Sequence, residues 1–154
     1  MKYLIPTLIL IVLSSCTIKN PDNTRMVKQD PVEIMTIKKV LHTQQECWNN
    51  GDIDGFMEGY WNSEELIFTS LNHKSTYGWK NTLERYRNSY PNKESMGEFK
   101  FEILDFKLTS SSTSTVKGKW ELIRENDNPN GMFWLDINKF EKDWLITKDS
   151  TISF

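Results

Sequence analysis

The chain has 154 residues, with 19 Lys or Arg against 21 Asp or Glu and a formal net charge of −2. This length suits one globular domain with a sizeable core, and there is no basic excess of the kind that nucleic-acid binding needs, so nucleic acid is not implied as a partner. Six Trp, eight Phe and five Tyr make the chain rich in aromatic side chains, which fill cores and also line pockets for flat apolar ligands.

Residues 1–15 have the layout of a secretory signal peptide. Lys2 gives a positive start, an apolar run follows over residues 4–13, and two serines precede Cys16. The apolar run is too short to span a bilayer, whereas its length and flanks are typical of a segment removed on export. We therefore expect export from the cell.

The sequence Leu13-Ser14-Ser15-Cys16 resembles the lipobox of bacterial lipoproteins. The resemblance implies cleavage before Cys16, attachment of a diacylglycerol to its thiol and a membrane anchor in the cell envelope; Thr17 in place of Asp favours the periplasmic side of the outer membrane. An ordinary signal peptide with an incidental cysteine is the alternative. Residues 16–31 are polar and read as a flexible tether, so the domain is expected over residues 32–154.

A long amphipathic helix is predicted from about residue 32 to Asn50. Its apolar face carries, at helical spacing, Ile34, Ile37, Leu41, Gln44 and Trp48. Gly51 suits the end of this helix, and Asp52 can cap a second, shorter helix that extends to Tyr60. This turn connects the two predicted helices.

A short strand is predicted at about residues 65–70, followed by a polar connection up to Tyr77. A third helix follows, because apolar side chains recur at spacings of four, three and four at Trp79, Leu83, Tyr86 and Tyr90. Pro91 prevents its continuation. Arg85 and Arg87 lie off the apolar face and are expected to be solvated.

Beyond Met96 the pattern predicts strands. Apolar side chains occupy odd positions from Phe99 to Ile103 and even positions from Leu104 to Leu108. Since such a change would swap the two faces of a strand, a β-bulge is predicted near Ile103-Leu104. Three further long strands are expected, at about residues 116–122, 132–140 and 144–152.

The order of helix, short helix, strand, helix and four long strands resembles the nuclear transport factor 2-like superfamily, which includes ketosteroid isomerase and SnoaL-like proteins. The resemblance covers residues 32–152 and is carried by these pieces: Trp48-Asn49-Asn50-Gly51-Asp52 with Phe56 and Tyr60, Gly78-Trp79 with Tyr86, Gly118-Lys119-Trp120, Gly131-Met132-Phe133, Trp144-Leu145-Ile146 and Asp149-Ser150-Thr151. It is similar to a subgroup of small exported domains of unknown function, in which a His commonly stands where this chain has Ser150.

The resemblance implies an α+β fold, in which three N-terminal helices pack on a curved, mainly antiparallel sheet. The sheet would form a cone, closed by the helices over an interior pocket. Homodimers through the outer face of the sheet are also implied.

The resemblance carries the catalytic groups of ketosteroid isomerase only in part. The family's helix-one Tyr falls at Gln44, and its catalytic base falls near Phe68-Thr69, where there is no acid. Steroid-type isomerisation is therefore not expected. Asp136, near the place of the second acid, and Asp149, on the last strand, are candidates for an acid or a base. The alternative for Asp149 is a hydrogen bond to the backbone or to a hydroxyl such as that of Thr151, or exposure to water.

Other kinds of site have little support. His42 and His73 lie far apart in sequence without acids or cysteines at metal-ligand spacing, and no cofactor motif is present, so neither a metal nor a cofactor is expected. Six aromatic side chains are the candidates to line the cone, with ordinary core packing as the alternative for each: Tyr60, Phe68, Trp79, Tyr86, Trp120 and Trp134.

Three functions follow from this interpretation. The first is a lipid-anchored module that binds a small apolar or aromatic molecule in the cone. The second is an enzyme that uses Asp149 or Asp136 as an acid or base, and the third is a structural dimer whose cone is filled by side chains. An open pocket of about 300 Å³ or more would separate the first two from the third. A cone filled by Trp120 and Trp134 would exclude both.

Overall fold

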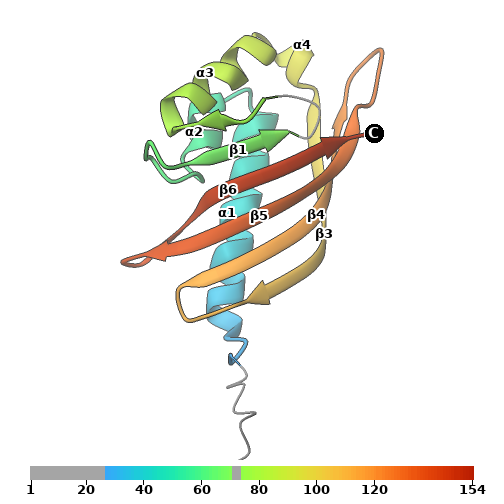
Figure 1. The fold of residues 1–154 in the computed structure, drawn as a ribbon. Helices are drawn as coiled ribbons and strands as arrows, with labels where there is room; N and C mark the ends of the chain where they lie inside the picture. Colours follow the sequence, from blue (N-terminus) through green and yellow to red (C-terminus); the bar gives the residue numbers. More distant parts are fainter. Residues whose placement is uncertain (1–26, 71–73) are drawn as a thin grey trace, which may run out of the picture.

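The computed structural model describes residues 27–70 and 74–154 (Figure 1). Its elements are, in chain order, α1 (Pro31–Asn49), α2 (Ile53–Met57), β1 (Ile67–Ser70), β2 (Thr76–Tyr77), α3 (Trp79–Ser89), α4 (Lys93–Met96), β3 (Glu98–Leu108), β4 (Thr113–Ile123), β5 (Asn130–Phe140) and β6 (Asp143–Ser153). The expected signal peptide and Cys16 lie outside the described residues. Within those residues, no helix has the length and apolarity needed to cross a bilayer.

The six strands form one curved sheet in the order β2-β1-β6-β5-β4-β3. All neighbouring strands are antiparallel except β1 and β6, which run parallel. Figure 1 shows α1 crossing one face of the sheet, with α2 and α3 towards one end of it. The predicted α+β fold, with helices packed on a curved and mainly antiparallel sheet, is confirmed.

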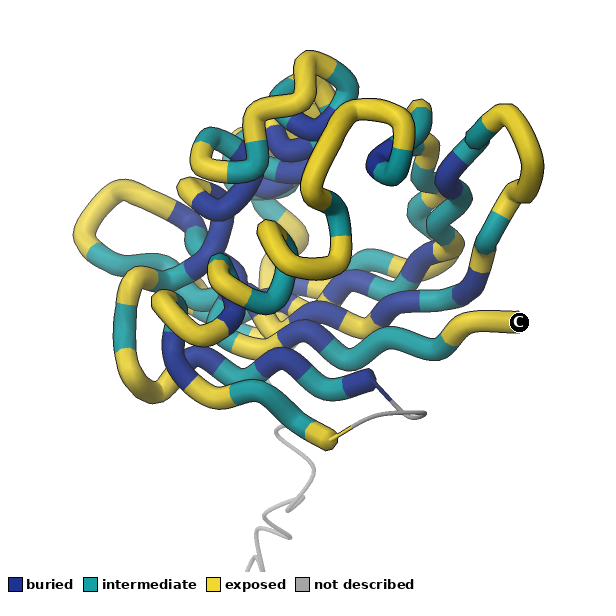
Figure 2. The backbone as a smooth tube through the Cα atoms, turned by 90° about the horizontal axis from the view of Figure 1, so that it is seen from above, coloured by how far each residue is buried: buried dark blue, intermediate teal, exposed yellow. Residues whose placement is uncertain are grey.

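The core lies between α1 and the sheet. The predicted helical face of α1 is the buried one, and it carries Ile37, Leu41, Gln44 and Trp48. Figure 2 shows buried stretches of the backbone alternating with half-buried and exposed ones along the strands. The turn after α1 is built as expected, because Gly51 has a positive φ of 80° and the Asp52 side chain accepts a hydrogen bond of 2.8 Å from the Gly55 N–H.

Two β-bulges exchange the faces of long strands. The first lies in β3, where Leu104 is the extra residue between Ile103 and Asp105, so the predicted bulge is confirmed. The second lies in β6, where Thr147 is the extra residue, because Asp136 pairs with Lys148 and Ile137 pairs with Ile146. This second bulge was not expected from the sequence. It reverses the faces of β6 beyond Ile146.

Three local predictions need correction. The segment expected to be a polar connection up to Tyr77 contains the two-residue strand β2, which pairs with β1. The short helix α4 was not expected; its Asn92 forms a capping box with Ser95 that makes one turn stable. The domain also begins before residue 32, because the side-chain amide of Gln29 pairs with the Leu108 backbone through two hydrogen bonds, of 3.0 and 3.1 Å.

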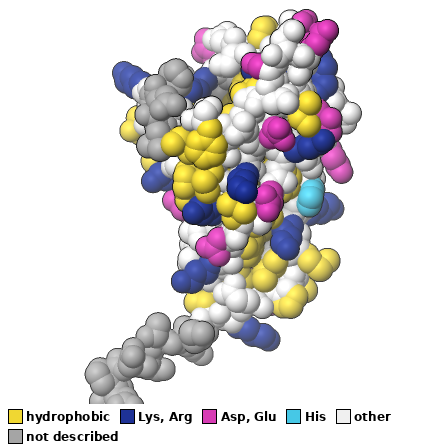
Figure 3. Space-filling view, turned by 90° about the vertical axis from the view of Figure 1, so that its right-hand side faces the viewer, with side chains coloured by type: hydrophobic (Ala, Val, Ile, Leu, Met, Phe, Trp, Pro, Cys, Tyr) yellow, Lys and Arg dark blue, Asp and Glu magenta, His cyan; other side chains and the backbone are white. Residues whose placement is uncertain are grey.

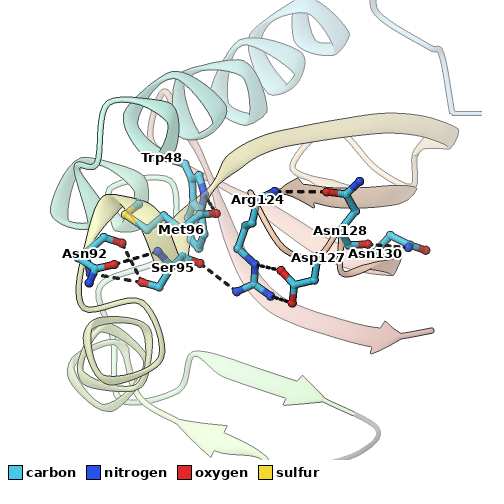
Figure 4. Close-up of polar contacts among 8 residues, drawn as sticks. All are labelled: Trp48, Asn92, Ser95, Met96, Arg124, Asp127, Asn128 and Asn130. Atoms are coloured by element: carbon cyan, nitrogen blue, oxygen red, sulfur yellow. Dashed lines mark hydrogen bonds and ion pairs between the residues drawn. The ribbon is translucent and has the colours of Figure 1, made fainter.

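Short polar contacts hold α4 between α1 and the loop that joins β4 to β5 (Figure 4). The Trp48 indole N–H donates to the Met96 carbonyl oxygen at 3.1 Å. The Arg124 guanidinium donates to the Ser95 carbonyl oxygen at 3.1 Å and makes two bonds, of 2.6 and 2.7 Å, to the Asp127 carboxylate. Side chains of α1 and of the β4–β5 loop therefore hold the backbone of α4 in place.

The surface carries charges of both signs. Figure 3 shows one side of the molecule, on which Lys and Arg side chains alternate with Asp and Glu and with scattered hydrophobic ones. This mixture agrees with the net charge of −2.

Candidate functional site

A cavity of about 290 Å³ lies between the helices and the inner face of the sheet. Its volume is close to the lower end of the range for small-molecule sites. The wall consists of the following residues: Leu41, Gln44, Trp48, Phe56, Tyr60, Phe68, Ser70, Arg85, Tyr86, Ser89, Tyr90, Phe99, Phe101, Trp120, Leu122, Phe133, Leu135, Ile146, Asp149, Thr151 and Ser153. The cone is therefore open and not filled by side chains.

Two glycines on neighbouring strands leave room for the large side chains of the wall. A Cβ on Gly118 would lie 2.3 Å from the Phe133 ring, and a Cβ on Gly131 would lie 2.8 Å from the Trp120 indole nitrogen. Each glycine thus leaves room for an aromatic ring of the adjacent strand. Both rings, Phe133 and Trp120, line the cavity.

Asp149 is the one carboxylate in this wall, and the bulge in β6 puts it there. Trp144 and Ile146 face the core at even positions, whereas beyond Thr147 the inward positions are odd and include Asp149. Asp149 is buried, with an exposed fraction of 7%. Its Oδ2 accepts a hydrogen bond of 2.7 Å from the Tyr60 hydroxyl, and Oδ1 has no hydrogen-bond partner among the described residues.

The donor to Asp149 is fixed through the backbone. Tyr60 and Ile146 form an isolated parallel bridge, with the Ile146 N–H donating to the Gly59 carbonyl oxygen and the Trp61 N–H donating to the Ile146 carbonyl oxygen, both at 2.9 Å. Tyr60 is therefore attached to β6 three residues before the carboxylate that it contacts.

Burial decides the protonation of this cluster. It raises the pKa of Asp149 from 3.8 to about 6, and the hydrogen bond from Tyr60 opposes this rise. Burial and then the negative charge of Asp149 hold the pKa of Tyr60 and that of Tyr86 well above the ordinary value, so both hydroxyls are neutral donors at physiological pH. The Tyr60 and Tyr86 hydroxyl oxygens lie 3.4 Å apart.

Trp120 supplies a second unpaired polar atom. Its indole Nε1 is buried and has no acceptor among the described residues. A buried N–H without a partner is costly, and sites that hold ligands are among the places where such groups occur. In the part of the chain that the structure describes, no three His, Cys, Asp or Glu side chains lie close enough to hold a metal ion.

The structure brings together four of the six aromatic residues expected at the cone: Tyr60, Phe68, Tyr86 and Trp120. The expectation for Trp79 is corrected, because its indole N–H donates to the Met57 carbonyl oxygen at 3.0 Å and joins α3 to α2. The expectation for Trp134 is also corrected. It lies 39% exposed on the outer face of β5, with the Lys117 ammonium 5.6 Å from its ring centroid.

The expectation for Asp136 is corrected as well. It is exposed on the outer face of β5, where it pairs in register with Thr115 and Lys148. Its parity on the strand is opposite to that of Leu135, which faces the cavity. Asp136 therefore cannot act on a molecule bound in the cone.

Arg85 was expected to be solvated, yet it contributes to the cavity wall. It precedes Tyr86 in α3, so it sits at the border of the apolar helix face, and its guanidinium carbon lies 4.9 Å from the centroid of the Phe68 ring. The sequence signal that could have identified it is this position at the border, combined with the long stem of an arginine.

The position that the family resemblance assigns to a catalytic base holds no acid, but an acid lies beside it. Phe68 of β1 is the in-register neighbour of Asp149 on β6. At the other matching position, the Gln44 side chain does not contribute a hydroxyl; its amide donates to the Phe56 carbonyl oxygen at 3.0 Å. The cavity thus contains a carboxylate, Asp149, and two tyrosine hydroxyls, of Tyr60 and Tyr86. They lie on different elements from those on which the resemblance places the catalytic groups.

Neither a scan of family models nor a search of curated proteins gives a match for the chain. Solved structures do match. An NTF-2-like protein of unknown function from Shewanella oneidensis is 42% identical, over 78% of this chain and 98% of that one, with a TM-score of 0.75.

Two more distant structures share the fold. A domain of unknown function with a cystatin-like fold from Nostoc punctiforme is 13% identical, over 80% of this chain and 78% of that one, with a TM-score of 0.69. A ketosteroid isomerase-like protein from Erwinia carotovora atroseptica is 13% identical, over 81% of this chain and 98% of that one, with a TM-score of 0.66. At this level of identity the likeness concerns the architecture alone.

Proposed function

The chain belongs to the nuclear transport factor 2-like family, and from this premise we propose that its cone binds a small, flat and largely apolar molecule. The observation that carries the proposal is the cavity of about 290 Å³ with its aromatic wall. Aromatic rings offer large, rigid contact surfaces for a flat ligand. The unpaired Asp149 Oδ1 and Trp120 Nε1 supply the few polar contacts that fix the orientation of such a ligand.

Calorimetric titration with 2-naphthol and with naphthalene tests this proposal. Both should bind, and 2-naphthol should bind more tightly, because its hydroxyl can donate to the free oxygen of Asp149. The variant Leu135→Phe places a larger side chain at the cavity wall and should abolish binding of both probes. Trp134→Phe, which changes the neighbouring residue on the outer face, is the matched control. Equal binding by the wild type and Leu135→Phe would exclude the cone as the binding site.

A second function, acid–base catalysis on the bound molecule, is favoured by Asp149 alone. A carboxyl group with a pKa of about 6 is ionised in part at neutral pH and can both accept and return a proton. The free Oδ1 would take a proton from a carbon next to a ligand carbonyl group, while Tyr60 stays hydrogen-bonded to Oδ2. Asp136, expected as the other candidate, has no part in this proposal.

Deuterium exchange into 2-tetralone, followed by NMR, tests the catalytic function. The wild type should accelerate exchange next to the carbonyl group over the buffer rate. Asp149→Asn should remove this acceleration, and Asp136→Asn should leave it unchanged. If 2-tetralone binds but exchanges at the buffer rate, the catalytic proposal fails and the binding proposal stands.

We also propose that the domain works at a membrane, as an exported lipoprotein anchored through Cys16 in the cell envelope, on the periplasmic side of the outer membrane. The support is the lipobox-like sequence before Cys16. Fractionation of the producing bacterium should find the wild type in the membrane fraction and Cys16→Ala outside it. Mass spectrometry of the N-terminal peptide should detect the diacylglycerol, and an unmodified Cys16 would refute the anchor.

Homodimer formation through the outer face of the sheet completes the proposal. Its support is the exposed side chain of Trp134 on that face. Light scattering should give twice the mass of the mature chain, and Trp134→Lys should give monomers. A monomeric wild type at micromolar concentration would refute the dimer.

A further inference from the structure

Arg85 differs from the other arginines that the structure describes. Arg87 on the same helix pairs with the Asp54 carboxylate, and Arg124 pairs with Asp127. For Arg85, no carboxylate lies within ion-pair distance among residues 27–70 and 74–154. Its only polar contact there is a hydrogen bond of 3.4 Å from Nη1 to the Thr76 hydroxyl.

The wall of the cavity is divided into a polar and an apolar part. The polar part comes from β1, β6 and α3, which contribute Ser70, Asp149, Thr151, Ser153, Arg85 and Ser89. The mainly apolar part comes from α1, α2, β3, β4 and β5, with Gln44 as its one amide, and its largest members are Trp48, Trp120, Phe56, Phe99, Phe101 and Phe133. The strand order explains this division, because β1 and β6 are neighbours and β3 lies at the far edge of the sheet.

Arg85 and Asp149 are both neighbours of Phe68 in the cavity wall. The guanidinium carbon of Arg85 is 4.9 Å from the centroid of Phe68, and Asp149 is the in-register neighbour of Phe68, at a strand spacing of about 4.8 Å. The polar part of the wall therefore offers one permanent cation and one acid with a free oxygen. A ligand with a single negative charge balances the cation, whereas a second negative charge would face Asp149.

We propose, on the basis of the cone-binding function proposed above, that the ligand is a small aromatic or alicyclic monocarboxylate, with its carboxylate on Arg85 and its ring against the aromatic part of the wall. A planar guanidinium matches a carboxylate through two parallel hydrogen bonds, and partial burial strengthens them. The ring of the ligand then takes up the remaining volume between Phe68 and the β3–β5 side of the cavity.

Calorimetric titration with 2-naphthoate and its neutral analogue 2-naphthamide tests the inference. The wild type should bind 2-naphthoate about tenfold more tightly than 2-naphthamide. Arg85→Gln should remove this preference while binding of 2-naphthamide is retained, and Arg85→Lys should restore part of it, because it restores the charge. Arg87→Gln on the same helix is the matched control and should keep the tenfold preference.

The outcomes separate this inference from the function on which it rests. If both probes bind equally to the wild type, or if the preference survives Arg85→Gln, Arg85 does not recognise a carboxylate although the cone binds rings. If no naphthalene derivative binds to the wild type, the cone-binding proposal fails and the inference fails with it. Melting curves of Arg85→Gln and Arg85→Lys distinguish loss of recognition from loss of folding.

Discussion

The two faces of the sheet carry the same kinds of residue in opposite settings. On the inner face, Asp149 is buried beside Tyr60 and Trp120 lines the cavity; on the outer face, Asp136 is in water and Trp134 is 39% exposed under Lys117. Residue type therefore says little about role here. The side of the strand decides it, and in β6 that side depends on the extra residue Thr147.

Deletion of Thr147 should have the largest effect, because it removes the extra residue that sets the inner face of β6. Without the extra residue, Asp149 and the core residues Trp144 and Ile146 cannot all face inward, since they have opposite parity. We expect a loss of more than about 4 kcal/mol in the free energy of unfolding, the size of a large core defect. Urea unfolding measures it. A deletion variant within about 1 kcal/mol of the wild type would show that the bulge does not determine the inner face.

Truncation of neighbouring residues on opposite faces should have the next largest effect. Ile137 is fully buried, so Ile137→Ala should lower the free energy of unfolding by about 3 kcal/mol through lost burial and the cavity that remains. Asp136→Ala, one residue earlier on the outer face, should change it by less than about 0.5 kcal/mol. Urea unfolding of both variants tests the difference, and equal losses would contradict it.

The two carboxylates should differ in their effect on stability with pH. Because burial raises the pKa of Asp149 to about 6 in the folded protein against 3.8 as an ordinary value, the folded state holds a proton that the unfolded state loses between these values. Stability from this group is thus complete below pH 3.8 and lost as the pH rises through 6. Asp149→Asn should be more stable than the wild type at pH 8 by up to about 3 kcal/mol.

The difference between wild type and Asp149→Asn should vanish below pH 4, where both side chains are neutral. Asp136→Asn is the matched control from the outer face and should follow the wild type across the whole range. Chemical unfolding from pH 3.5 to pH 8 provides the measurement. An advantage of Asp149→Asn that does not grow with pH would mean that Asp149 is not buried as a proton-binding group.

The two tryptophans should give the smallest effects. Trp134→Phe removes the contact with Lys117 and should cost less than about 1 kcal/mol. In fluorescence, Trp134→Phe should reduce the emission that acrylamide quenches, whereas Trp120→Phe should reduce the change seen when a non-fluorescent ligand fills the cavity, a change to which Trp48 also contributes. The reverse assignment would place the two rings on the wrong faces.

The sequence predicts part of the fold and part of the candidate site. Helix periodicity placed the buried face of α1 correctly, and the change of parity between Ile103 and Leu104 predicted the bulge in β3. The bulge at Thr147 was not predicted, since the next four residues, 148–151, are polar and show no apolar alternation. Without that bulge the direction of Asp149 could not be derived, although Asp149 itself was a candidate.

Trp134 was misplaced for a related reason. Residues 132–140 carry large side chains on both faces, so periodicity alone cannot say which face is inside. Arg85 was misplaced because an off-face arginine is usually solvated, and only the packing of α3 over β1 brings its guanidinium to the Phe68 ring. Both errors concern how elements are brought together, which depends on contacts between distant parts of the chain.

The attachment of Tyr60 to the backbone of β6 has a consequence for how a guest molecule can enter. Both Tyr60 and Asp149 are held on β6, Tyr60 through the bridge at Ile146, and the contact with α3 is the longer one of 3.4 Å between the Tyr60 and Tyr86 hydroxyls. Helix α3 packs on the other side of the cavity from β6 and is joined to α2 by the hydrogen bond from Trp79. If α3 tilts to admit a ligand, Arg85 and Tyr86 move with it, whereas Asp149 and Tyr60 keep their positions before the ligand binds.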